Sequence, residues 1–544
     1  MISLEKFYSD VDKQLLKQIV TFYSKREFNK AFDLINERLE NLKVCQKKED
    51  FYLKIELAGF LIDIAEEGRI REAALQGLEI IEKERKNIKG IVHDGSIEYN
   101  LGNAKSTLFK IEKENPGFEY IPRNINNLLE SKNHYWRAYK YEIDNDKPFS
   151  PDLIVNLANT MSNCGRIVES LQYYDLVLKK YPSFPQANAS RANQLIWLNK
   201  FTGTLTPNLI YQAKSGYEIA SKSSNISKWL RDFWKKEAIN LGENLKKLNF
   251  DEKTVHQDLE ETQKEFESLS AYRKFCINNH LTLSEHSLYC NCIGSRRDDL
   301  IICTPFHPFD AVFIPVMEKI LNRLKSEFSL ARLLFYYSTK NDENEFTTYD
   351  SEVMFTELYD AESMGTKPEM LRTSFRLCFG ILDKIASAFC KLFYLADNKE
   401  NIYFERFWKP NKNKGSLKQK TRWQKINKIY NISLIALYTQ ATDLNDKNGE
   451  WSFFKSWRNA LEHNQLTLLT DRELSDDIFE IYKNNPSLLV VDEIYFQSKT
   501  LQMLQFTRSA IFNYVFLVRN EAGKANHKKG VPIKHTFRFR NDYE

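Results

Sequence analysis

Hydrophobic positions recur at helical spacing along most of the chain. In the segment 153–182, LIVNLANTMSNCGRIVESLQYYDLVLKKYP, apolar residues return every three or four positions on both sides of Cys164–Gly165. Patterns of the same period cover 309–338, 367–396, 425–444 and 499–521. They predict an all-α protein, and 18 Gly and 14 Pro in 544 residues are too few for a turn-rich β architecture.

The N-terminal half resembles a series of tetratricopeptide repeats. Small residues stand where paired helices approach closely and larger ones where they fill the groove, at Ile154, Leu157, Ala158, Met161, Gly165, Ser170, Tyr174, Val177 and Pro182. Gly68–Arg69, in the similar segment 57–84, lies 97 residues before Gly165–Arg166, close to three repeat lengths. We therefore predict a tetratricopeptide-like helical solenoid over residues 1–250. Its concave surface would bind a partner, or it would serve only as a packing scaffold.

A connecting segment, 251–309, separates this region from the C-terminal part. It contains several thiols and imidazoles: Cys276, His280, His286, Cys290, Cys292 and Cys303. A zinc site needs ligands that close a tetrahedron, but no C-x2-C pair is present and Cys290-x-Cys292 is an awkward pair. We expect ordinary buried thiols here, and no metal.

Composition bounds the class of protein. Hydrophobic residues make up 42% and charged residues 28%, an ordinary globular balance. The first residues lack an apolar signal core, the longest apolar runs are too short for a bilayer, and eight scattered cysteines indicate a reducing compartment. These features predict a cytoplasmic protein with no membrane contact. The net charge of +5 is modest, yet residues 401–430 hold nine Lys or Arg against one acid.

Long amphipathic patterns with short links predict an antiparallel helical bundle over residues 310–544, with a basic tail. One of them is WSFFKSWRNALEHNQL, 451–466. On a helical wheel Phe453, Phe454, Trp457, Ala460, Leu461 and Leu468 share one arc, and Arg458, Glu462, Asn459 and His463 fill the opposite arc. The polar cluster is therefore expected to face solvent or a partner.

Two interpretations of this cluster are open. In the simpler one, Arg458 and Glu462 form a surface ion pair and His463 is solvated. In the other, His463 moves a proton and Arg458 binds phosphate, which suits phosphodiester cleavage without a metal or another cofactor because RNA supplies its own 2′-hydroxyl. One helix is not a complete site, but a two-fold dimer would place two Arg and two His around one groove.

Arg458-Asn459-Ala460-Leu461-Glu462-His463 resembles the motif of the HEPN superfamily (higher eukaryotes and prokaryotes nucleotide-binding), Arg-x4–6-His with Asn, Asp or His after the Arg. SFRLCFGILDKIASAF, 374–389, is similar to the helix ahead of that motif in a bacterial branch with N-terminal tetratricopeptide-like repeats. The resemblance covers roughly 310–520. It implies a dimeric, metal-independent ribonuclease, with His463 as general acid or base, Arg458 stabilising the phosphate and Asn459 orienting the site. Such proteins often act in anti-phage defence or as growth-arresting toxins.

A basic segment with aromatic residues, 405–428, is a candidate RNA-binding region. Positive charge follows a nucleic-acid backbone, and aromatic rings stack on unpaired bases. The candidates are Lys412, Lys414, Lys418, Lys420, Arg422 and Trp423. The alternative is a solvated loop whose tryptophans are anchored in the core.

The sequence thus favours a homodimeric endoribonuclease acting on RNA, regulated through its repeats by a protein or phage-derived trigger. A second hypothesis is a catalytically silent HEPN and repeat protein that binds nucleotide, RNA or a protein partner. A third is a repeat-based interaction protein whose Arg and His cluster has no function. The target, the trigger and any antitoxin are not encoded in a recognisable pattern.

Overall fold

The chain forms two compact units in a computed structural model. One comprises Met1–Cys164 and Tyr173–Ala187, and the other Gly165–Gln172 and Asn188–Glu544. The predicted domain limits at residues 250 and 309 stay a prediction. The structure describes residues 8–42, 47–87, 93–112, 121, 124–202, 206–251, 263–290, 297–302, 306–307, 314–340, 350–356, 361–396, 401–408, 417–445, 449–470, 488–524 and 533–534.

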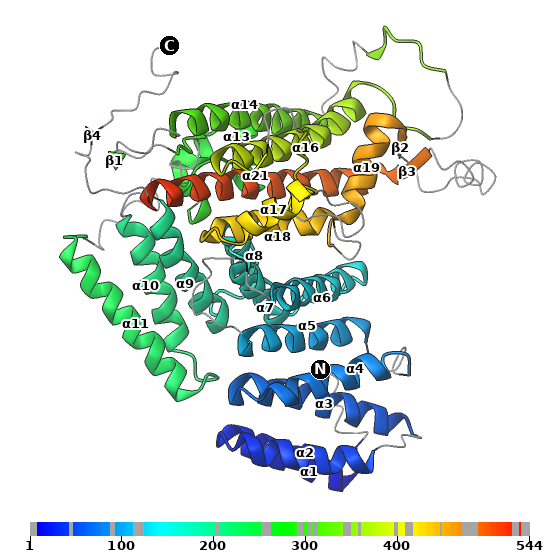
Figure 1. Cartoon of the computed structure of the whole chain (residues 1–544), viewed down its shortest axis with the longest axis vertical. Coiled ribbons are helices and arrows are strands. Elements are labelled where there is room, and N and C mark those ends of the chain that lie inside the picture. Colours follow the sequence, from blue (N-terminus) through cyan, green and yellow to red (C-terminus); the bar gives the residue numbers. More distant parts are fainter. Residues whose placement is uncertain are drawn as a thin grey trace. The chain divides into compact units, whose positions relative to one another are not determined.

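The first unit is a succession of helices, each packed on its neighbours along the chain (Figure 1). They are α1 Asp10–Ser24, α2 Phe28–Asn41, α3 Lys48–Gly68, α4 Arg71–Glu84, α5 Asp94–Ile111, α6 Ile125–Asp144, α7 Pro151–Asn163 and the later part of α8 Ile167–Lys180. The pairing of successive helices agrees with the predicted solenoid, whereas the tetratricopeptide resemblance stays a prediction.

The hairpin of α7 and α8 follows from local sequence. Ser150 accepts a hydrogen bond from the Leu153 amide, and Pro151 occupies the first helical turn, where it loses no hydrogen bond. Gly165 has a φ of +74°, a conformation that other residues rarely adopt. The apolar repeat positions are buried as predicted, at Ile154, Leu157, Ala158, Met161, Tyr174 and Val177.

The second unit is mainly a helical bundle. Its helices are α9 Pro185–Phe201, most of which belongs here, α10 Pro207–Ser221, α11 Lys228–Lys247, α13 Ala271–Asn278, α14 Ile314–Ser338, α16 Thr366–Leu392, α17 Leu417–Ile426, α18 Ile432–Asn445, α19 Ser452–His463 and α21 Glu493–Lys524, with a short 3-10 helix, η2 His286–Leu288. Helix α21 is the central element: it packs on α14 and α16 and on α18, and it runs between these groups in Figure 1. The all-α class is confirmed.

The second unit also contains two small sheets. β1 Phe306–His307 pairs antiparallel with β4 Ile533–Lys534, and β2 Gln465–Leu469 pairs parallel with β3 Leu488–Asp492. On its other side β2 meets Glu362 in an antiparallel bridge. The helical pattern drawn through Leu468 was therefore wrong beyond His463, because the chain becomes extended there and pairs with distant segments.

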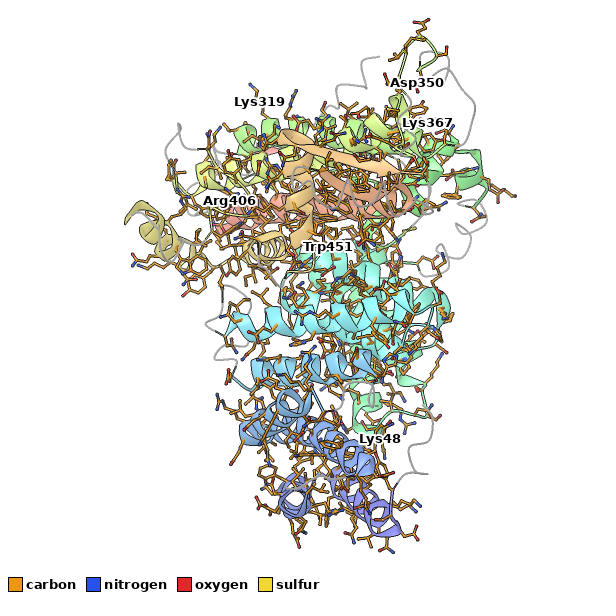
Figure 2. The ribbon with its side chains drawn as sticks, turned by 90° about the vertical axis from the view of Figure 1, so that its right-hand side faces the viewer. Lys48, Lys319, Asp350, Lys367, Arg406 and Trp451 are labelled. Carbon is orange, nitrogen blue, oxygen red and sulfur yellow. The ribbon has the colours of Figure 1, made fainter. Side chains whose placement is uncertain are left out.

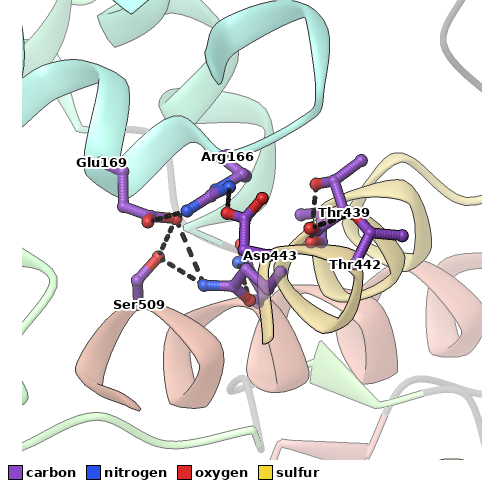
Figure 3. A network of polar contacts seen from close by, with 9 residues as sticks. Arg166, Glu169, Thr439, Thr442, Asp443 and Ser509 are labelled. Atoms are coloured by element: carbon purple, nitrogen blue, oxygen red, sulfur yellow. Dashed lines mark hydrogen bonds and ion pairs between the residues drawn. The ribbon is translucent and has the colours of Figure 1, made fainter. Parts of the chain in front are cut away.

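A buried polar network joins Arg166 and Glu169 to α18 and α21 (Figure 3). Arg166 forms ion pairs with Glu169 and with Asp443 of α18, and its side chain is 1% exposed. Glu169 also accepts hydrogen bonds from Gln440 at 3.2 Å and from Ser509 of α21 at 2.8 Å. The Asp443 carbonyl oxygen accepts the Trp451 amide at 3.1 Å, so this network fixes the turn that leads into α19.

Candidate functional site

Helix α19 is held in the second unit by one apolar face. Phe454, Trp457 and Ala460 are buried on it. The Phe375 ring of α16 lies 5.3 Å from the Phe454 ring, and the Phe496 ring of α21 lies 5.1 Å from the Trp457 ring, measured between centroids. These ring contacts fix α19 against both helices and so fix which way its polar residues point.

Arg458 points across to α16. Its Nη2 donates to Asp383 Oδ2 at 3.1 Å, its Nε lies 3.7 Å from a Glu462 carboxylate oxygen, and its guanidinium carbon lies 5.1 Å from the centre of the Phe379 ring. Only 15% of the side chain is exposed. The expectation that Arg458 faces outward was thus wrong in part, because an acidic partner on the neighbouring helix draws the guanidinium inward.

Asp383 joins three segments. Its Oδ1 accepts the backbone amide of Phe404 at 2.9 Å, while its Oδ2 accepts Arg458. Burial raises the pKa of this carboxyl, and the Phe404 amide and the Arg458 charge oppose that effect without cancelling it. The carboxylate therefore ties the 401–408 segment and α19 to α16.

Asn459 and His463 are exposed, as the wheel predicted. Among the described residues, none forms a hydrogen bond with either side chain. His463 is the last residue of α19, and Asn464 continues in an extended conformation into β2. Both side chains are thus available to a ligand or to a second chain.

Two more cations and a tyrosine surround this face. Lys455 precedes Arg458 by one turn, and burial lowers its pKa, as do the charges of Arg406 and Arg458, against the opposing charge of Glu405. Arg406, labelled in Figure 2, has a side chain that is 58% exposed. Its guanidinium carbon lies 5.8 Å from the centre of the Tyr403 ring, and so does that of Arg458.

Four members of this cluster were not predicted from the sequence. Lys455 carried a usable signal, because a residue three positions before Arg458 shares its helical face. Arg406 and Tyr403 belong to or border the basic segment but were not singled out. Asp383 lies 75 residues from Arg458, and no local pattern connects them.

The predicted RNA-binding lysines remain predictions. Lys412 and Lys414 lie outside the described residues, and Lys418 and Lys420 belong to α17. The two remaining candidates serve the fold: Arg422 is 4% exposed and donates from Nε to the Leu395 carbonyl oxygen at 3.1 Å, while the Trp423 ring lies 5.5 Å from that of Tyr438. Their contribution in this structure is packing, which a count of charges cannot distinguish from RNA contact.

The cysteine and histidine segment is only partly described. Cys276 is buried, Cys290 is partly exposed, and His286 Nδ1 lies 2.9 Å from the Tyr289 hydroxyl. Cys292 and Cys303 lie outside the described residues. Within the described part of the chain, no three His, Cys, Asp or Glu side chains come together in a way that could hold a metal ion.

Comparison with known proteins finds a match in the C-terminal part. Residues 310–521 match the family model described as LA2681-like HEPN, which supports a HEPN superfamily member. The match fits a ribonuclease or nucleotide-binding role. No curated protein and no solved structure matches the chain. In the described ranges, none of the helices combines the length and the apolar character needed to traverse a bilayer.

Proposed function

We propose that this protein is a metal-independent endoribonuclease whose site is built from Arg458, Asn459 and His463 of α19. The observation that carries the proposal is the position of these residues inside the HEPN match. Arg458 is held in place by Asp383, and His463 and Asn459 stay exposed on the same helix. A fixed cation and an exposed imidazole on one helix suit acid–base chemistry on a phosphodiester.

The reaction would use the substrate's own 2′-hydroxyl. Its proton passes to a general base as the 2′-oxygen forms a bond to phosphorus, and the bond from phosphorus to the 5′-oxygen breaks. A general acid returns a proton to that oxygen, which leaves a 2′,3′-cyclic phosphate and a 5′-hydroxyl. His463 would transfer protons, Arg458 would stabilise the charge on the phosphate oxygens, and Asn459 would orient the substrate.

A single α19 offers one imidazole, whereas this reaction uses both an acid and a base. A second copy related by a two-fold axis would supply the other imidazole and a second guanidinium. We therefore include a homodimer through the HEPN domain in the proposal. The N-terminal helices would receive a trigger, in anti-phage defence or growth arrest; this part rests on the family resemblance alone.

One observation favours the alternative of a silent binding protein. Arg458 already has an internal acceptor, Asp383, and its side chain is mostly covered. A guanidinium that is already paired with a carboxylate binds a phosphate group less strongly. On this view the same face binds RNA or nucleotide without cleaving it.

Cleavage of labelled RNA by the full chain in EDTA tests the proposal. Wild type is compared with His463→Ala, Arg458→Ala and, as a control, Lys319→Met, an exposed lysine of α14. We expect wild type and Lys319→Met to leave cyclic phosphate ends and the other two variants to lose at least about a hundredfold in rate. Equal cleavage by His463→Ala would assign the activity to another site.

Mixing wild type with an excess of His463→Ala tests the composite site. A heterodimer of the two chains holds one imidazole in a shared groove, where the proposed reaction uses two. Loss of the wild-type activity on mixing would support a shared site. Undiminished activity of the wild-type protomers in demonstrated heterodimers would mean that each protomer acts alone.

A further inference from the structure

Two arginines stand beside the ring of Tyr403. The guanidinium carbons of Arg406 and Arg458 each lie 5.8 Å from its centroid, and the residue is 41% exposed. The ring is therefore reachable by a ligand while two cations stand next to it. Cations next to an exposed aromatic ring are the groups that take up the phosphate and the base of one nucleotide.

A turn of the backbone sets this arrangement. The amides of Arg406 and Phe407 both donate to the Tyr403 carbonyl oxygen, at 3.0 and 3.2 Å. Phe404 and Phe407 are buried on the inner side of the turn, and Asp383 accepts the Phe404 amide. With the inner side anchored, Tyr403 and Arg406 are presented outward in a prearranged geometry, which lowers the entropy lost on binding.

The charges around the turn are unevenly paired. Asp383 and Glu462 both interact with Arg458, and Glu405 lies 3.5 Å from Arg406. No described residue pairs with the Lys455 ammonium, although Lys455 is partly buried near both arginines. Like charges held together are unfavourable in the free protein, and a bound anion would relieve that repulsion.

We propose that Tyr403, Arg406 and Lys455 form a binding site for a nucleotide of single-stranded RNA adjacent to the cleaved bond. Arg406 and Lys455 contact its phosphate, and the Tyr403 ring stacks on its base. The position of this nucleotide next to the cleaved bond rests on the proposed function, which places Arg458 at the cleaved phosphate. The binding site itself does not depend on cleavage.

Binding is measured on the full chain carrying His463→Ala, so that the RNA stays intact. The probe is a fluorescein-labelled oligouridine of about 12 nucleotides, within the length that a single-strand groove covers. Anisotropy titrations at several salt concentrations compare this parent with added Arg406→Gln, Lys455→Met, Tyr403→Leu or Tyr403→Phe. Lys319→Met is the control, since Lys319 and Arg406 lie well apart in Figure 2.

We expect Arg406→Gln and Lys455→Met each to weaken binding and to reduce the slope of log affinity against log salt by about 0.7. Tyr403→Leu should weaken binding by about tenfold, and Tyr403→Phe, which keeps the ring, should bind like the parent. Lys319→Met should change neither affinity nor slope. Parent-like binding by both charge variants, or no RNA binding by the parent, would overturn the proposal.

The binding and cleavage assays together distinguish a failure of this binding-site proposal from a failure of the nuclease proposal. If binding depends on these three residues but wild type does not cleave RNA, the nucleotide site stands and the nuclease proposal fails. If wild type cleaves RNA and Arg406→Gln, Lys455→Met and Tyr403→Leu all bind like the parent, the nuclease stands and this site is wrong.

Discussion

The guanidinium of Arg458 and the carboxylate of Asp383 link the helix with the candidate catalytic residues to α16. Nη2 and Oδ2 are 3.1 Å apart, and the side chains are 15% and 20% exposed. Because neither group is well solvated, each depends on the other. The same contact that positions Arg458 also neutralises it, so the pair stands at the centre of both functional hypotheses.

A double-mutant cycle measures this dependence. Asp383→Ala and Arg458→Ala should each lower the free energy of unfolding, since each leaves the partner without its counter-charge. The double variant should be more stable than the sum of the two losses predicts, with a coupling of about 0.5–3 kcal/mol. Urea unfolding gives all four values, and a coupling near zero would show that the pair contributes nothing.

The buried Arg166 should matter far more to stability than an exposed arginine. Arg166→Met leaves Glu169 and Asp443 without their cation, and we expect a loss of about 3–5 kcal/mol in unfolding free energy. The matched control is Arg71→Met, which breaks the pair with Glu112 at 2.7 Å but is 56% exposed. That variant should lose less than about 1 kcal/mol.

Hydrogen exchange in peptides from α18 and α21 is the measurement for this comparison, because it reports on the surroundings of the network directly. Faster exchange there in Arg166→Met, with little change in Arg71→Met, is the expected result. Similar exchange in both variants would contradict the assigned role.

Gly165 should tolerate no side chain. Its φ is +74°, and a Cβ there would lie 2.5 Å from the Ile432 carbonyl oxygen, so Gly165→Ala should destabilise the protein by more than about 1 kcal/mol. At Gly523, in α21, a Cβ would meet no described atom within 4 Å beyond the backbone of its own helix. Gly523→Ala should therefore be neutral or stabilise by up to about 1 kcal/mol. The midpoints of thermal unfolding of the two variants test this prediction. Equal midpoints would show that a side chain at residue 165 causes no strain.

Asp298 gives the stability a dependence on pH. Burial alone would raise its pKa, but the hydrogen bonds and charge of Arg332, with Nη1 to Oδ1 at 2.8 Å, hold it below the ordinary value. The stabilisation is thus present above the unfolded pKa of about 3.9 and is lost as pH falls through the lowered folded value. We expect residues 281–290 and 297–302 to lose exchange protection below about pH 4.

Arg332→Gln should remove this pH dependence and lower the exchange protection of residues 281–290 and 297–302 already at neutral pH. The control is Arg323→Gln on the same helix, where the arginine is 69% exposed. Its pH profile should follow wild type. If Arg332→Gln also follows wild type below about pH 4, Asp298 is not the group responsible.

Local patterns predicted local structure well. Helical spacing placed Leu157 and Met161 in the interior, and the wheel placed Phe454, Trp457 and Ala460 on the buried face of α19. In each case the neighbours that decide burial are a few positions away in the sequence. The Gly165 turn was predicted for the same reason, because its conformation is a property of the residue itself.

Partners far apart in sequence were beyond such patterns. Asp443 lies 277 residues from Arg166 in the sequence. Strand β2 pairs with β3 on one side and meets Glu362 on the other, and no short stretch of sequence contains all three segments. Arg422 of α17 shows another limit of such patterns: its charge made it an RNA-binding candidate, but its burial and its hydrogen bond to the Leu395 carbonyl oxygen could not be read from charge. Candidate residues and the local pair of Arg458 with Glu462 could be named from the sequence, but their partners on distant segments could not.

The Arg166 network bears on how such a protein can evolve. The residues that match the HEPN family begin at 310, yet Asp443, Gln440 and Ser509 are complementary to Arg166 and Glu169, which lie far upstream. A recombination joint near residue 310 would bring in a bundle without its arginine and leave a carboxylate stranded in the interior. We therefore expect the segment 165–172 and the bundle to be inherited together, so that a lineage exchanging its N-terminal helices keeps this short stretch or replaces both sides of the network.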